Sequence, residues 1–166
     1  MSAKILIAYA TRAGSTAEIA QAMGKAMTAR GAIVDVKPIA QVADIAAYQL
    51  IVLGSVVHAG RLMPEVMRFV RAHKAELVAR PVAAFTVCLA AKSPDSAATC
   101  RAYLDPLRKE LTLADEAFFA GKMDYERVGF IARFIVKNLV KAPEGDFRDW
   151  AAIGKWAENV LAKTLK

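Results

Sequence analysis

The chain has 166 residues, which is enough for one domain and short for two. Hydrophobic residues make up 56% of it and charged residues 23%, a composition that excludes a disordered or fibrous protein. The formal net charge of +7 points to anionic partners and leaves the fold open. The two cysteines, Cys88 and Cys100, form neither a C-x-x-C pair nor a secreted disulfide framework, and the first apolar run is too short for a signal peptide. We therefore expect an intracellular protein.

Five apolar runs of strand length recur along the chain, and they are rich in Ile, Val, Leu and Ala rather than alternating with polar residues. Such runs are typical of strands buried on both faces of a parallel sheet. The predicted strands span residues 4–10, 32–39, 49–55, 81–88 and 116–120.

Segments with helical spacing separate these strands. In the first, Ile19, Met23 and Met27 recur at every fourth residue, and Ser15 with Glu18 three residues later is typical of a capping box. Further helices are predicted over 64–77, 96–113 and 150–165. The alternation of strand and helix predicts an α/β fold, a doubly wound parallel sheet of five strands in a single domain over 1–166.

One segment interrupts this alternation. About thirty residues, 121–149, separate the fifth strand from the last helix, where a minimal fold needs only a few. Within it, 127–141 contains four basic residues and no acidic one. As a helix, this stretch would have an apolar arc and an opposite basic arc that includes Phe130 and Phe134. A helix packed on the domain, a helix at an anionic membrane surface and a lid over an aromatic, carboxylate-bearing substrate all remain open.

The loop after the first strand is the strongest candidate for a binding site. In doubly wound sheets, ligands bind beyond the carboxyl ends of the strands, where the strand order reverses. Hydroxyl groups and free backbone N–H groups converge there at the positive end of a helix dipole, which suits a phosphate group. An ordinary helix cap would use the same residue types. The loop consists of Thr11, Arg12, Ala13, Gly14, Ser15 and Thr16.

Other sites known from this topology are absent from the sequence. It has no G-x-x-x-x-G-K-[ST] loop and no G-x-G-x-x-G among its nine glycines, which argues against a nucleoside triphosphatase and a dinucleotide site. A cofactor-free receiver domain would need carboxylates where Ala10, Thr11, Gly54 and Ser55 stand. No groove-reading motif accompanies the positive charge, so we expect no nucleic-acid partner.

The pattern Tyr9-Ala10-Thr11-x-x-Gly14-x-Thr16-x-x-x-Ala20 resembles the flavodoxin signature, and the resemblance covers essentially the whole chain. It implies a flavodoxin-like fold with strand order 2-1-3-4-5, and FMN whose 5′-phosphate lies on the loop 11–16. The segment 121–149, with its GDFRDW ending, resembles more particularly the flavodoxin-like quinone-dependent protoporphyrinogen oxidases of bacteria. That resemblance implies an FMN-dependent oxidoreductase of haem biosynthesis, which passes electrons from a porphyrinogen through FMN to a quinone.

The resemblance also places the flavin ring between the loops that follow the third and fourth strands. Many flavodoxins stack Trp or Tyr on the ring, whereas His58 is the only ring-bearing residue in these two loops. At least one flavin face is therefore expected to be open to a substrate. His58 can stack, donate a proton or cap the loop, and Cys88 is expected to be a small buried hydrophobic residue. The implied contacts are Ser55, Val56, Val57, His58, Ala59 and Gly60 in the first loop, and Cys88, Leu89, Ala90 and Ala91 in the second.

The charge near these loops is positive. Arg61 and Lys92 stand in them, and the nearest carboxylate in sequence is Asp95. A nearby cation stabilises an anionic reduced flavin and raises its potential, although both side chains can instead point to water. We expect substrate contacts at Arg61, Lys92 and Arg127 and no metal ligands, and no side chain stands out as a general base.

Two other flavoprotein functions remain open, a flavodoxin electron carrier and an NAD(P)H-quinone reductase. Carriers tend to expose an acidic face toward their partners, so the net charge of +7 argues against the carrier. The predicted partners are a quinone and an anionic small molecule. The predicted location is the cytoplasm, at the inner face of the cell membrane if 127–141 binds lipid.

Overall fold

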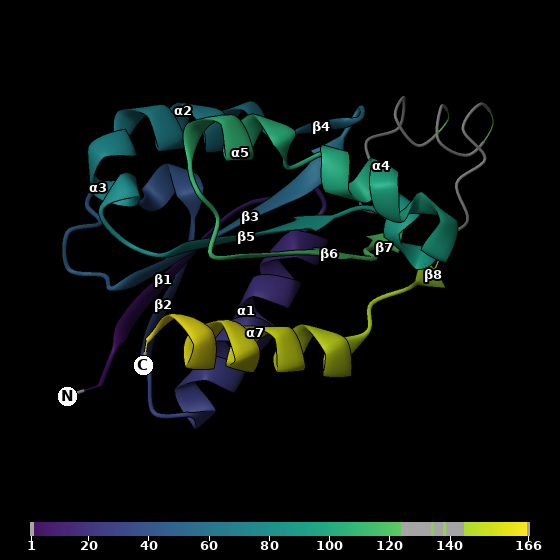
Figure 1. Ribbon diagram of the computed structural model, residues 1–166. Helices are drawn as coiled ribbons and strands as arrows, with labels where there is room; N and C mark the ends of the chain where they lie inside the picture. Colours follow the sequence, from purple (N-terminus) through teal and green to yellow (C-terminus); the bar gives the residue numbers. More distant parts are fainter. Residues whose placement is uncertain (1, 124–133, 135–137, 139–144, 166) are drawn as a thin grey trace.

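A mixed sheet of six strands runs through the centre of the protein, with helices on both faces (Figure 1). The computed structural model describes residues 2–123, 134, 138 and 145–165. The five parallel strands lie in the order β2-β1-β3-β5-β6, which confirms the predicted order 2-1-3-4-5, because β5 and β6 are the fourth and fifth of the expected strands. Their bounds are Lys4–Ala10 for β1, Ile33–Pro38 for β2, Leu50–His58 for β3, Val82–Val87 for β5 and Asp115–Phe119 for β6. The short β4, Arg61–Leu62, pairs antiparallel with the end of β3.

The helices form two layers. On one face of the sheet lie α1 and α7, and on the other lie α2, α3, α4 and α5 (Figure 1). Short 3-10 helices connect them at Ile39–Gln41, Leu89–Lys92 and Pro94–Ser96. The α-helices are Ser15–Ala29 for α1, Pro64–Ala72 for α2, Lys74–Val78 for α3, Ala97–Ala102 for α4, Asp105–Glu110 for α5 and Trp150–Thr164 for α7.

Burial on both faces explains the continuous apolar strands. On β3, Leu53 packs into the core beneath α2 and α5, while its neighbour Val52 packs into the core beneath α1 and α7. The two side chains are at most 1% exposed. Burying one such side chain contributes about 1.5–3 kcal/mol, so central strands gain from an apolar residue at every position.

The helix predictions need three corrections. Ser15 is not the N-cap residue of α1: Gly14 is, with no side-chain cap, so the predicted capping box is wrong. The predicted helix 64–77 is broken at His73, whose ring packs on Phe69 with centroids 4.6 Å apart. The predicted helix 96–113 is also two helices, because Pro106 lacks a backbone N–H and fits only in the first turn of α5.

The long segment after β6 begins and ends in a small antiparallel ribbon. Its strands are β7, Lys122–Met123, and β8, Gly145–Asp146. Of the predicted basic stretch 127–141, only Phe134 and Asn138 belong to the described residues, and Phe134 is 61% exposed. Within the described part of the chain, no helix combines the length and the apolar character needed to cross a membrane.

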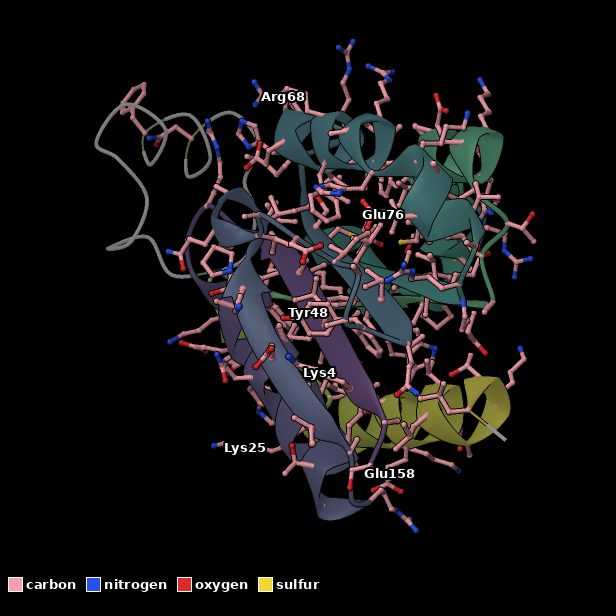
Figure 2. All side chains as sticks on the ribbon, turned by 90° about the vertical axis from the view of Figure 1, so that its left-hand side faces the viewer. Lys4, Lys25, Tyr48, Arg68, Glu76 and Glu158 are labelled. Atoms are coloured by element: carbon pink, nitrogen blue, oxygen red, sulfur yellow. The ribbon has the colours of Figure 1, made fainter. Side chains whose placement is uncertain are left out.

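The far edge of the sheet, along β2, is closed by polar contacts. Figure 2 shows Lys4 and Tyr48 there, with the Lys4 ammonium 5.1 Å from the centroid of the Tyr48 ring. The Tyr48 hydroxyl donates to Asp35 at 2.6 Å, and burial, with the help of this bond, raises the pKa of Tyr48 to about 12. These groups therefore stabilise the edge strand β2, and they lie away from the carboxyl ends of the strands.

Candidate functional site

The loop between β1 and α1 is held in a tight turn by its own residues. Gly14 has φ 90°, a left-handed conformation in which a side chain is strained. Its N–H donates to the Thr11 hydroxyl at 3.1 Å, and its carbonyl accepts the Glu18 N–H at 3.1 Å. This turn starts α1 at Ser15, directly beyond the carboxyl end of the first strand.

Several hydrogen-bond donors at this helix start have no acceptor within the part of the chain that the structure describes. They are the backbone N–H groups of Ser15, Thr16 and Ala17, and the Thr16 hydroxyl, which is fully buried. Leaving a buried donor unpaired costs about 1–3 kcal/mol. An anion placed here would pair these donors at the positive end of the helix dipole. The geometry therefore fits a phosphate group better than an ordinary capped helix.

The hydroxyl groups of the loop are oriented by backbone donors. Thr11 Oγ1 accepts from Gly14 N–H, and Ser15 Oγ accepts from Lys122 N–H at 3.0 Å. Because a hydroxyl both accepts and donates, each keeps its own O–H for a further acceptor. Arg12 is exposed and Ala13 half-buried.

The segment after the expected end of the third strand is a hairpin rather than a loop. β3 continues to His58, three residues beyond the predicted strand, and turns through Ala59 and Gly60 into β4. Both turn residues have positive φ, 50° and 73°, as a two-residue hairpin turn requires. Ser55 is buried and accepts the Met63 N–H at 3.0 Å, so its side chain serves the fold. Val56 and Val57 are half-buried, whereas His58, Ala59, Gly60 and Arg61 are exposed.

A contact between Arg12 and His58 joins the two predicted cofactor segments. The Arg12 Nη1 lies 3.1 Å from His58 Nε2. Because a guanidinium only donates, Nε2 of His58 is the acceptor in this contact. The tip of the hairpin therefore lies against the β1–α1 loop, which the sequence alone did not predict.

The second predicted flavin loop, Cys88 to Ala91, runs into the short 3-10 helix Leu89–Lys92 and is held by hydrogen bonds. The Ser96 hydroxyl donates to the carbonyls of Ala90 and Ser93, and Cys88 N–H donates to Phe119 O at 3.0 Å. Ser96 is thus a positioning residue that sequence reasoning missed. Leu89, Ala90 and Ala91 are half-buried.

The two cysteines lie together behind this turn. Their sulfur atoms are 3.6 Å apart, both residues are buried and neither is in a disulfide. Burial raises the pKa of the Cys88 thiol to about 12, so it stays protonated at neutral pH. A protonated, buried thiol is a poor nucleophile, in agreement with the expected packing role of Cys88.

The three predicted substrate residues lie in different places. Arg61 is exposed on β4, and Arg127 lies outside the described residues. Lys92 is exposed, with its ammonium 4.9 Å from the centroid of the Phe147 ring. Lys92 and Phe147 border a cavity of about 370 Å³ that is also lined by Phe118 and Phe119. Nowhere in the described ranges do three or more metal-ligating side chains gather.

Comparisons with known proteins extend this geometry. A family model described as a flavodoxin domain matches residues 6–149. The protoporphyrinogen IX dehydrogenase (quinone) of Leishmania major is 27% identical over 179 residues, which cover 99% of this chain and 77% of that protein. The Escherichia coli K12 protein of the same name is 25% identical over 178 residues, covering 98% and 97%. Oxidised flavodoxin 1 from Bacillus cereus superposes with a TM-score of 0.64 at 14% identity, covering 96% of this chain and 98% of that chain.

These matches confirm the predicted resemblance, and the solved structure confirms the predicted α/β fold. The flavodoxin domain match confirms the predicted FMN cofactor, and the two named relatives confirm the predicted class, an oxidoreductase. With the family model spanning most of its length, the chain belongs to the flavodoxin domain family.

Proposed function

We propose that this chain is a protoporphyrinogen IX dehydrogenase that delivers electrons to a quinone. Two relatives of that name match it over almost its whole length, including the segment after β6. The observation that carries the proposal furthest is the absence of any indole or phenol from the hairpin 55–61 and the turn 88–91. Without such a ring to cover it, a flavin between these segments keeps a face for a substrate.

Different segments of the chain would bind different parts of FMN. FMN, when bound, supplies the two-electron redox chemistry. The donors at the start of α1 would hold its phosphate, while backbone amides of the hairpin and of the turn after β5 would face the ring. Each cycle removes two electrons and two protons from the porphyrinogen and gives them to the quinone, which leaves as the hydroquinone.

Lys92 is the predicted substrate contact with the best structural support. Lys92 ends the 3-10 helix Leu89–Lys92, and the cavity beside it is lined by the aromatic residues Phe118, Phe119 and Phe147 and by Asp149. A ring-bearing substrate gains from such faces, and a carboxylate gains from the cation. Arg61, exposed on β4, is the second candidate.

The predicted membrane contact through 127–141 belongs to the same proposal, and its residues lie mostly outside the described part. Co-sedimentation with vesicles tests it. Retention on anionic vesicles and not on neutral ones, lost at high salt, supports the contact. Equal recovery in the supernatant with both kinds of vesicle contradicts it.

The reaction is tested under anaerobic conditions with the FMN-loaded protein, protoporphyrinogen IX and menadione. A rise in porphyrin fluorescence that requires both protein and quinone supports the proposal. The absence of this rise contradicts the substrate assignment and leaves FMN binding intact. Direct bleaching of the flavin absorbance by NADPH would instead favour the NAD(P)H-quinone reductase, and electron delivery only to a redox protein would favour the carrier.

A further inference from the structure

The segment 121–149 after β6, called the inserted segment below, packs through its described residues directly on the start of α1. Lys122 N–H donates to Ser15 Oγ at 3.0 Å, and Phe147 N–H donates to Gly121 O at 3.2 Å. Gly121 is so close to the loop that a Cβ there would lie 3.4 Å from Ser15 Oγ and 2.9 Å from Val87 Cγ1. The start of α1 and the ribbon β7–β8 therefore form one packed unit.

Arg148 ties this unit together through its side chain, which is only 6% exposed. The guanidinium donates to both carboxylate oxygens of Asp146, at 2.6 and 2.8 Å, and to Oε2 of Glu18. It also lies 4.4 Å from the centroid of the Trp150 ring. One arginine thus pairs with a carboxylate of the inserted segment and with one in the first turn of α1.

Because Glu18 lies in the first turn of α1, its pairing with Arg148 affects the binding of an anion at this helix end. A carboxylate in the first turn of a helix stabilises the free helix dipole, but it repels a phosphate group bound at the same end. Asp146 also carries its charge, since the hydrogen bond from Arg148 lowers its pKa to about 2. Lys122 also offsets part of the Asp146 charge, and without Arg148 the remaining negative charge of Glu18 and Asp146 would oppose phosphate binding.

We propose that Arg148 is a positioning residue of the phosphate site, which offsets the charge of Glu18 and Asp146 and fixes the inserted segment against the start of α1. Arg148 acts through these carboxylates, so its effect depends on the phosphate group of the ligand. The proposal rests on FMN binding and is independent of the substrate.

The test compares FMN with riboflavin, which has the same ring and no phosphate. Dissociation constants are measured for the apoprotein from the quenching of flavin fluorescence. R148A should weaken FMN binding roughly 3- to 10-fold and change riboflavin binding less than about 2-fold, because the lost interaction is with the phosphate charge. The loss should shrink at 0.5 M KCl, where charges are screened more strongly.

Two further variants separate charge from packing. E18Q in the R148A background should recover most of the lost FMN affinity, because it removes the negative charge that Arg148 offsets in the wild type. R148K should fall between wild type and R148A, since lysine keeps the charge without the two-pronged geometry.

A matched control is available at the other end of α1. Arg30 pairs with Glu158 of α7 at 2.5 Å, at the lower end of the molecule in Figure 2, so R30A removes an exposed arginine–glutamate pair of the same helix far from the loop. It should leave both flavin affinities unchanged. If R148A does not fold, E18Q alone still tests whether the charge of Glu18 opposes phosphate binding. The expected result is tighter binding of FMN. Equal weakening of FMN and riboflavin by R148A, or no gain of FMN affinity from E18Q, would overturn the proposal.

Discussion

The buried hydroxyl of Thr16 gives the sharpest test of the phosphate site. Thr16 is fully buried in α1, and its Oγ1 has no hydrogen-bond partner within the described residues. The substitution T16V replaces this hydroxyl with a methyl group of nearly the same size and keeps the branching at Cβ. It therefore changes hydrogen bonding while leaving packing and helix propensity almost unchanged.

The substitution should have opposite effects on the empty and the loaded protein. In the apoprotein it removes an unpaired buried donor, so the free energy of unfolding should rise by about 1 kcal/mol, within the 1–3 kcal/mol range for such groups. For a chain of this size that is a rise in Tm of about 2–4 °C. In the complex it removes a hydrogen bond to a charged acceptor, about 1.5–3 kcal/mol, which weakens FMN binding roughly 10- to 100-fold.

The assay combines urea unfolding of the apoprotein with fluorescence titration of FMN and riboflavin. The matched control is T86V, which removes another buried hydroxyl that has no hydrogen-bond partner among the described residues. Thr86 lies on β5, separated from β1 by β3, so T86V should stabilise the apoprotein without affecting FMN affinity. If T16V binds FMN as tightly as T86V does, the Thr16 hydroxyl does not meet the phosphate and the reasoning fails.

Three further predictions concern the elements around the site. G54A should destabilise the protein by about 1–3 kcal/mol in urea unfolding, because its Cβ would come within 2.2 Å of the Phe85 ring; wild-type stability would contradict this. A59N should raise the free energy of unfolding by about 0.5–1 kcal/mol, since Asn tolerates the positive φ of the hairpin turn better than Ala; an unchanged denaturation midpoint would refute it. Arg148 lowers the pKa of Asp146 to about 2 from 3.8, so its stabilisation is present above pH 4 and lost as the pH falls toward 2. Because Asp146 is 40% exposed, the loss should be about 1 kcal/mol, and D146N should abolish this acid step in unfolding measured against pH.

The order of the elements could be predicted because each strand is an uninterrupted apolar run. The boundaries of the elements could not be predicted where contacts between residues distant in sequence decide them. The third strand ends at His58 rather than Ser55, since its last residues pair with β4 across a turn that the sequence showed only as polar and small residues. The break at His73 is likewise not visible in the sequence, because Phe69, Val70 and Leu77 keep helical apolar spacing across it.

The phosphate loop was predictable in composition and not in its hydrogen bonding. Residues 11–16 could be placed between the first strand and the first helix because that signal is local, and their role as a phosphate site stays a prediction. The partners of the loop come from far away: Lys122 is 107 residues from Ser15, and Arg148 is 130 residues from Glu18. No spacing rule predicts such contacts, since they depend on how the segment after β6 returns to the start of α1.

Ser15 and Glu18 show how contacts with the segment after β6 change the start of α1. Their spacing matches a capping box, in which each side chain would bond a backbone N–H of the helix start. In the folded chain, Ser15 is instead the first residue of the helix, with its oxygen on the Lys122 N–H, and Glu18 pairs with Arg148. The inserted segment thus engages both side chains that local rules assign to the helix end. Because the helix lacks a side-chain cap, it gives up some local stability, and its first N–H groups stay available to the phosphate group that we propose there.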